Sequence, residues 1–336
     1  MMRRGRVVLN WFESVALRGN PAGDPHERRV PVYLPPAYDA QPGRRFPVVF
    51  VLAGFTGRGR MLLNDNAWAP ALDDRMDLLI ARGMGQMILV MPDCLTRFGG
   101  SQYLDSTANG DYARHLVGEL VPWVDATYRT QADRAHRGIA GKSSGGYGAL
   151  IHGMRNADVF GAVACHSGDM CFDYCYRPDL AKFCALVDEA GGLEPWWKGF
   201  SSRIQKSKDD FLALNILGMA AAYSPNPATR PFGVDLPCDL ATGEFREDVW
   251  ARWLALDPLQ LVERHAAALS SLRLLHIDCG TRDEWNLHLG ARLLHRKLEA
   301  LGVAHVHEEF DDGHMNVGYR YDVSLPRLAG ALGAEP

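Results

Sequence analysis

Short apolar runs alternate with longer amphipathic stretches along most of this chain of 336 residues. Such alternation is typical of a mostly parallel sheet whose strands are connected by helices on its two faces. The clearest apolar run is PVVFVL at residues 47–52, which has no polar position and therefore suits a strand that is buried on both faces. The pattern predicts an α/β fold with a sheet at its centre.

The predicted elements follow this rhythm closely. Two segments before the first apolar run, residues 6–17 and 28–34, are predicted as antiparallel strands, and Pro35 ends the second of them. The other strands are predicted over residues 47–52, 86–91, 136–140, 161–165, 272–278 and 304–310. Helices are predicted over residues 68–82, 110–128, 144–154 and 283–301, and from about residue 314 onward.

Residues 168–268 interrupt the alternation with a stretch rich in aromatic residues, proline and glycine. We expect this segment to be an inserted cap, with residues 1–167 and 269–336 forming the core domain. Aromatic side chains in a cap more often form a small core of their own than line a substrate pocket, so we expect only one or two at the site. The candidates for substrate contact are Trp196, Trp197, Phe200 and Trp250.

Composition argues against several classes of function. The net charge of −4 is spread along the chain without a basic block, which argues against a nucleic-acid partner. No stretch has the roughly 18 uncharged apolar residues of a membrane helix, and the first 20 residues lack the unbroken apolar segment of a secretory signal. The seven cysteines form no CxxC pair, so we expect reduced thiols in the cytoplasm and assign neither metal nor cofactor. The sequence does not determine the number of subunits, and a homo-oligomer is one of the alternatives.

The strongest motif is a G-x-S-x-G formed by Gly141, Ser143 and Gly145, which directly follows a predicted strand and directly precedes a predicted helix. In that context the motif predicts a nucleophile elbow, a sharp turn that exposes a serine. Glycines beside the serine let strand and helix approach closely. A glycine-rich structural turn is the alternative in a chain with 34 glycines, but the flanking elements favour the elbow.

A serine hydroxyl needs an adjacent base, and after a nucleophile elbow the acid and then the histidine follow along the chain. His314 fits this order because it lies in FDDGHMN, just past the last predicted strand. We expect its imidazole within hydrogen-bonding range of the Ser143 hydroxyl, with an ordinary loop histidine as the alternative. The other late histidines lie within predicted strands or helices: His276, His288, His295, His305 and His307.

The acid is expected after the penultimate strand, where DCGTRDEWN offers Asp278, Asp283 and Glu284. Asp278 ends the predicted strand and is expected to point along it. Asp283 follows a turn, where it can begin the next helix and accept a hydrogen bond from the His314 ring. Its alternative role is that of a plain helix N-cap. We prefer Asp283 to Glu284 as the acid.

The same chemistry requires two backbone N–H groups that stabilise the oxyanion of a tetrahedral intermediate. One is predicted on Ser144, directly after the nucleophile. The other is predicted on Phe55, in the loop LAGFTG after the first buried strand. Gly54 lets that loop turn inward and is expected to contact the substrate; a simple surface turn is the alternative.

These stretches together resemble the putative esterase family of α/β-hydrolases, which includes S-formylglutathione hydrolases and bacterial mycolyltransferases. The resemblance is carried by VVFVLAGFTG, GGSQYLDS, VPWVDATYRT, GIAGKSSGGYGAL, HIDCGTRDE and DDGHMN. It implies an α/β-hydrolase fold and the same roles for Ser143, Asp283, His314, Phe55 and Ser144. Two positions depart from many relatives, since Ala53 replaces a histidine and Ser144 replaces a methionine. Neither change removes a backbone N–H, so the shape of the pocket is what they affect.

We expect a serine carboxylesterase that cleaves small-to-medium carboxylic esters or thioesters, its small-molecule partners, through an acyl-enzyme at Ser143. An acyltransferase of the mycolyltransferase type is the first alternative, because an alcohol then replaces water on the same intermediate. S-formylglutathione hydrolysis is the second, although the segment 168–268 is larger than that resemblance implies. A non-catalytic binding protein with this fold is the third. The presence of all three triad candidates in the expected order argues against it.

Overall fold

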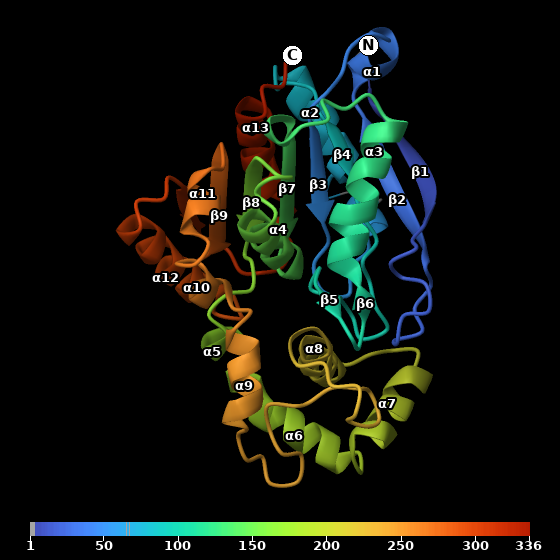
Figure 1. The fold of residues 1–336 in the computed structure, drawn as a ribbon, viewed down its shortest axis with the longest axis vertical. Helices are drawn as coiled ribbons and strands as arrows, with labels where there is room; N and C mark the ends of the chain where they lie inside the picture. The colour runs from blue at the N-terminus through green and yellow to red at the C-terminus, as the bar shows by residue number, and fades with distance from the viewer. Residues whose placement is uncertain (1–3, 65, 67) are drawn as a thin grey trace.

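An eight-stranded sheet forms the centre of the molecule in this computed structural model, which describes residues 4–64, 66 and 68–336 (Figure 1). The strands lie in the order β1 (Arg6–Glu13), β2 (Glu27–Leu34), β4 (Ile88–Val90), β3 (Val48–Leu52), β7 (Arg137–Lys142), β8 (Ala162–His166), β9 (Leu274–Gly280) and β10 (Val306–Phe310). The β1–β2 and β2–β4 pairs are antiparallel, and the other neighbouring pairs are parallel. The predicted mostly parallel sheet is confirmed.

Alternate side chains of the central strands fill two hydrophobic cores, one on each face of the sheet, because successive residues of a strand point to opposite faces. Phe50 belongs to the core shared with α3 (Val121–Thr127), α4 (Ser144–Arg155) and α12 (Leu287–Ala300). Val49 belongs to the core shared with α2 (Leu72–Ala81) and α13 (Tyr321–Ala331). Every residue of β3 is buried, which explains why that strand has no polar position.

Several predicted helices begin later than expected because loops precede them. The predicted helix 110–128 starts with the short strand β6 (Gly110–Asp111), paired with β5 (Asp105–Ser106), and continues as a π-helical turn over Arg114–Leu120 before α3. Helix α12 begins at Leu287 and not at Asp283. Helix α13 begins at Tyr321, after a 3₁₀ turn over Val317–Arg320, and not at His314. The remaining short elements are α1 (Pro36–Ala40) and 3₁₀ turns over Gly59–Leu63, Arg134–His136 and Arg177–Asp179.

The segment between β8 and β9 is helical and shares its hydrophobic core with the rest of the chain. Tyr147 of α4 lies with its ring 5.7 Å from that of Tyr223 and 6.1 Å from that of Phe172, and its hydroxyl donates to the carbonyl oxygen of Leu256. The segment contains α5 (Phe172–Cys175), α6 (Leu180–Glu189), α7 (Leu193–Ser202), α8 (Lys208–Tyr223), α9 (Glu247–Leu254), α10 (Pro258–Leu261) and α11 (Ala266–Ser270). Helices α6 to α9 gather at the end of the molecule opposite the C-terminus (Figure 1).

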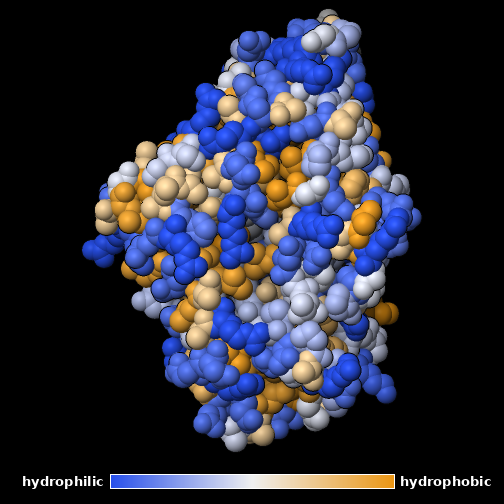
Figure 2. Space-filling view, in the orientation of Figure 1, coloured by the Kyte–Doolittle hydropathy of each residue, from blue (hydrophilic) through white to orange (hydrophobic). Residues whose placement is uncertain are grey.

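On the face that Figure 2 shows, hydrophilic side chains cover most of the surface, and hydrophobic ones appear as smaller patches among them. Scattered apolar side chains of this kind are usual on folded proteins. No helix within the described residues has the length and apolar character needed to cross a bilayer.

Candidate active site

The turn between β7 and α4 holds Ser143 in a strained backbone conformation. Its φ of 58° and ψ of −128° lie in a region that residues with a side chain seldom adopt. Two backbone bonds fix the turn, since the Ser143 N–H donates to the His166 carbonyl oxygen at 2.9 Å and the Tyr147 N–H donates to the Ser143 carbonyl oxygen at 2.9 Å. The serine therefore stands at the end of the strand, at the start of the helix.

Gly145 is required where α4 meets the sheet. A Cβ atom at this position would lie 2.2 Å from the backbone carbonyl oxygen of Leu52 in β3, far inside van der Waals contact. A Cβ atom at Gly141 would lie 2.3 Å from the carbonyl oxygen of Gly145. The two glycines thus allow the close approach that a nucleophile elbow needs.

Ser143 and His314 line one cavity of about 220 Å³. The cavity lies between the elbow, the loop after β3, helix α8 and the loops that follow β9 and β10. Its aromatic wall is formed by Phe55, Phe211 and Trp285. The ring of Phe211 lies 5.7 Å from that of Phe55 and 6.2 Å from that of Trp285. The cavity brings together residues that are far apart in the chain, from Gly54 to Met315.

The His314 ring is held by Asp283, whose carboxylate Oδ2 lies 2.7 Å from Nδ1 of the imidazole. Oδ1 of Asp283 accepts hydrogen bonds from the backbone N–H groups of Trp285 at 3.0 Å and Leu287 at 3.4 Å. Burial alone would raise the pKa of Asp283, but the His314 ring and these N–H groups outweigh burial and lower the pKa below its usual value. Asp283 is therefore a carboxylate that can fix the ring orientation.

Glu284 contacts a different atom of the same histidine. Its Oε2 accepts a hydrogen bond from the backbone N–H of His314 at 2.7 Å, and so anchors the loop and not the ring. The ring edge packs against Trp285, with 4.7 Å between the ring centres. The geometry thus favours Asp283 over Glu284 as the partner of the imidazole.

The expected hydrogen bond between the Ser143 hydroxyl and the His314 imidazole is not among the bonds that the described residues form, although both side chains line the cavity. Catalytic contacts of this kind are often long until substrate binds.

The loop after β3 brings Gly54 and Phe55 to the elbow. A Cβ atom at Gly54 would lie 3.5 Å from the Ser143 Cβ atom, so the loop backbone approaches the nucleophile closely. Both residues and Ser144 line the cavity. The Ser144 hydroxyl donates to Asp169 Oδ2 at 3.1 Å. Ser144 is also the first residue of α4, where a backbone N–H has no partner within the helix.

Asp169, a buried residue that sequence reasoning missed, also lines the cavity. Its Oδ2 also accepts hydrogen bonds from the Tyr176 hydroxyl at 2.8 Å and the Gln102 amide at 3.0 Å. Burial raises the pKa of Asp169, and these hydrogen bonds oppose the rise. Helix α8 contributes two further missed residues, Phe211 and Asn215. No spacing in the sequence marks these residues, because long-range packing alone brings them here.

The tryptophans expected at the site lie elsewhere. Trp196 and Trp197 pack against Phe200, with ring centres 5.3 and 5.5 Å from it, within a cluster on α7. The Trp250 indole is buried, where it donates to Asp173 and stacks 5.4 Å from Trp253. These side chains belong to the large hydrophobic core or pack against it, and of the expected substrate contacts only Gly54 lines the cavity.

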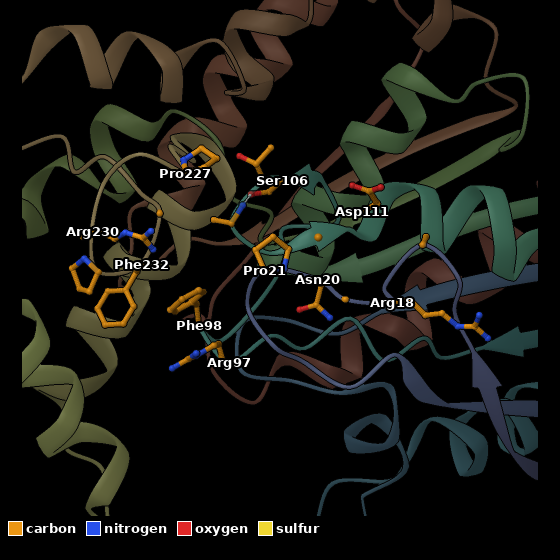
Figure 3. A pocket seen from close by; sticks show the side chains of 17 residues that line it. Arg18, Asn20, Pro21, Arg97, Phe98, Ser106, Asp111, Pro227, Arg230 and Phe232 are labelled. Carbon is orange, nitrogen blue, oxygen red and sulfur yellow. Dashed lines mark hydrogen bonds between the residues drawn. The ribbon is translucent and has the colours of Figure 1, made fainter.

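Three larger cavities among the described residues have no histidine in their walls. One of about 640 Å³ is lined by arginine, proline and phenylalanine together with small and polar residues, and has no histidine, lysine or cysteine in its wall (Figure 3). The hydroxyl of Ser106 in that wall already donates to the carbonyl oxygen of Ala221. Cavity size alone therefore does not identify the reacting site.

A buried cluster of His166, His276 and Asp278 has the donor types of a metal site. Asp278 accepts from His166 Nδ1 at 2.7 Å, from His276 Nε2 at 3.2 Å and from the Arg320 guanidinium at 2.9 Å. Nε2 of His166 bonds the Ser324 hydroxyl at 2.8 Å, so both of its ring nitrogens are engaged. A guanidinium inside the cluster disfavours a second cation, and we assign the cluster a structural role. The Asp278 carboxylate is thus bonded from β8, from its own strand β9 and from the 3₁₀ turn before α13, and Asp278 is not among the residues that line the cavity of Ser143.

We expect Asp278→Asn to lower the free energy of unfolding by about 3–5 kcal/mol at pH 7, because it breaks a buried charge network. Burial would raise the pKa of Asp278, but the two histidines outweigh it and hold the pKa well below its usual value. A carboxyl whose pKa is depressed in the folded state stabilises that state above its unfolded pKa, so the effect should shrink as the pH falls below about 4. Urea denaturation at several pH values measures this.

The control is Asp311→Asn, whose side chain is 86% exposed and forms only a surface ion pair with Arg282. We expect a loss below about 0.5 kcal/mol for it. Equal losses for the two variants would contradict a structural role for the cluster.

Comparisons with known proteins agree on one family. The chain is 29% identical over 229 residues to an esterase of Mycobacterium tuberculosis, an alignment that covers 65% of this chain and 46% of that protein. It is 31% identical over 161 residues to an endo-1,4-β-xylanase/feruloyl esterase of Xylanibacter ruminicola, covering 45% of this chain and 20% of that protein. The chain thus spans less than half the length of these curated relatives.

Solved structures of similar fold include a ferulic acid esterase, with a TM-score of 0.63, 20% identity and coverage of 98% of this chain and 99% of that one. An S-formylglutathione hydrolase from Agrobacterium tumefaciens gives a TM-score of 0.58 at 16% identity, covering 100% of this chain and 98% of that one. These likenesses confirm the predicted α/β-hydrolase fold. The family model described as putative esterase matches residues 24–322, and the chain therefore belongs to the putative esterase family.

Proposed function

We propose that this protein is a serine carboxylesterase in which Ser143 is the nucleophile, His314 the base and Asp283 the acid. One observation carries the proposal: the strained serine of the elbow opens into the same cavity as a histidine whose Nδ1 lies 2.7 Å from a buried carboxylate. The relatives named as esterases support this chemistry.

In the proposed reaction the Ser143 oxygen attacks the acyl carbonyl carbon while Nε2 of His314 takes the hydroxyl proton. The N–H groups of Phe55 and Ser144 bind the oxyanion. Collapse of the intermediate expels the alcohol or thiol, which receives the proton from His314. Water then attacks the acyl-enzyme with His314 as base, and releases the carboxylic acid and the free serine.

Residues 168–268 act as a cap in this proposal, and the core domain comprises residues 1–167 and 269–336. The role of this segment as a cap is supported by Phe211 and Asn215 of α8, which line the cavity together with Ser143. A volume of about 220 Å³ is below the roughly 300–1,000 Å³ of pockets for drug-sized ligands and so favours the small end of the proposed ester range. We further propose a cytoplasmic location, supported by the seven free, buried cysteines.

The test is turnover of p-nitrophenyl acetate and butyrate together with labelling by a fluorophosphonate probe. We expect release of p-nitrophenol and a single covalent adduct, which mass spectrometry locates on the peptide containing Ser143. Labelling should stop after prior incubation with a serine hydrolase inhibitor. A protein that neither turns over these esters nor accepts the probe would refute the esterase proposal and favour a binding protein.

A further inference from the structure

Lys142 directly precedes the proposed nucleophile and lines the same cavity, where it is half-buried. Burial of an ammonium group is costly unless a partner neutralises it. Desolvation accordingly lowers the pKa of Lys142, although the surrounding carboxylates oppose the change. Those carboxylates belong to Asp283, Asp169 and Glu284, and they act on the ammonium through space without a hydrogen bond to it.

Each of these three carboxylates is already engaged by another group. Asp283 bonds the His314 ring, and Glu284 bonds the His314 backbone N–H. Asp169 accepts three hydrogen bonds through one oxygen, as described above. Within the described part of the chain, Lys142 is the only lysine or arginine in the cavity wall. Its ammonium is thus the cation of this site that has no committed partner.

We propose that Lys142 determines specificity by pairing with an anionic group, such as a carboxylate, that the ester substrate carries close to its scissile bond. This inference rests on the proposed esterase function of the same cavity. Because Lys142 is one residue from the nucleophile, the anionic group must lie near the reacting carbonyl, on either the acyl or the alcohol side. A charge-assisted hydrogen bond of this kind favours a charged substrate over its neutral analogue by about 10- to 100-fold.

Two matched substrate pairs test the two sides. Mono-p-nitrophenyl glutarate against p-nitrophenyl pentanoate places the charge on the acyl group, and 4-acetoxybenzoate against its methyl ester places it on the leaving group. The measured quantity is the ratio of kcat/KM for the charged ester to that for the neutral ester. We expect a ratio above one for the wild type in at least one pair, and a fall in that ratio of about 10-fold or more in Lys142→Met.

Lys142→Arg keeps the charge and should restore most of the ratio, which a merely structural role of the lysine would not explain. The matched control is Lys198→Met on α7, where an exposed lysine outside the cavity is removed and the ratio should stay at the wild-type value. If Lys142→Met does not fold, the wild-type ratios decide alone, and ratios at or below one in both pairs overturn the inference. Unchanged ratios in a folded Lys142→Met do so as well.

Binding separates this inference from the esterase proposal. Calorimetry on Ser143→Ala should show that monomethyl glutarate binds at least about 10-fold more tightly than it does to Ser143→Ala combined with Lys142→Met. Such binding without any hydrolysis by the wild type would refute the esterase function and leave the anion site standing. If the wild type hydrolyses the esters but neither the binding of monomethyl glutarate nor the kcat/KM ratios change in Lys142→Met, the esterase function stands and the anion site is refuted.

Discussion

Ser143→Ala is expected to lower kcat/KM for p-nitrophenyl butyrate by about 10⁴- to 10⁶-fold, because no acyl-enzyme can form without the hydroxyl. The fold should persist, since the turn is held by backbone bonds of Ser143 to His166 and Tyr147 that the substitution keeps. Steady-state kinetics and circular dichroism measure the two effects. Fluorophosphonate labelling should disappear together with turnover.

The adjacent serine supplies the matched control. Ser144→Ala keeps the backbone N–H proposed for the oxyanion and loses only the hydroxyl bond to Asp169 at 3.1 Å. We expect it to lower kcat/KM by about 10-fold or less. A large loss in Ser144→Ala together with full activity in Ser143→Ala would exchange the roles of the two hydroxyls and contradict the elbow assignment.

The parts of the site that follow strand ends were predictable from the sequence. A parallel sheet brings the carboxyl ends of β3, β7, β9 and β10 to one edge, so loops far apart in the chain meet there. The G-x-S-x-G motif and the loop with Gly54 are each marked by a short apolar run before them, and the loop with His314 follows the last predicted strand. The order of the elements therefore anticipated the meeting of Asp283 with His314.

The walls of the cavity were not predictable in this way. Phe211 and Asn215 reach the site because α8 packs across the end of the sheet, and nothing in their local sequence distinguishes them from the other residues of that helix. Trp250 is the opposite case: it was expected to contact the substrate, but its side chain is buried against Trp253 and Asp173. Apolar side chains in an inserted segment serve its own core and the pocket alike, and only the packed structure separates the two.

Helix starts near the site were mispredicted for a related reason. Asp283 has the residue type of an N-cap, and its carboxylate accepts from the N–H groups of Trp285, in the loop before α12, and of Leu287, the first residue of α12, but it also holds the His314 ring. The loop around His314 likewise delays α13 to Tyr321. Side chains that hold the site form hydrogen bonds that compete with the start of a helix. Helix propensity, which depends on local sequence, does not include that competition.

Asp283→Asn is expected to lower kcat by about 10³- to 10⁴-fold at pH 7.5 with little change in fold. The carboxylate accepts a hydrogen bond from Nδ1–H of His314 at 2.7 Å, which keeps the ring proton on Nδ1 and leaves Nε2 free to act as base. An amide nitrogen at the same place donates to Nδ1 instead, which puts the imidazole proton on Nε2 and removes the base. Pre-steady-state release of p-nitrophenol reports the acylation step directly.

Glu284→Gln is the comparison that isolates this effect, because it removes a negative charge one residue away. Its amide oxygen can still accept the bond from the His314 backbone N–H, now made at 2.7 Å by the carboxylate. We therefore expect a loss of about 10-fold or less in kcat. Since both variants remove one negative charge near the imidazole, a large difference between them must come from the tautomer of the ring and not from the local potential. Similar losses would mean that the two carboxylates act only through their charge, and Asp283 would then not be the orienting acid.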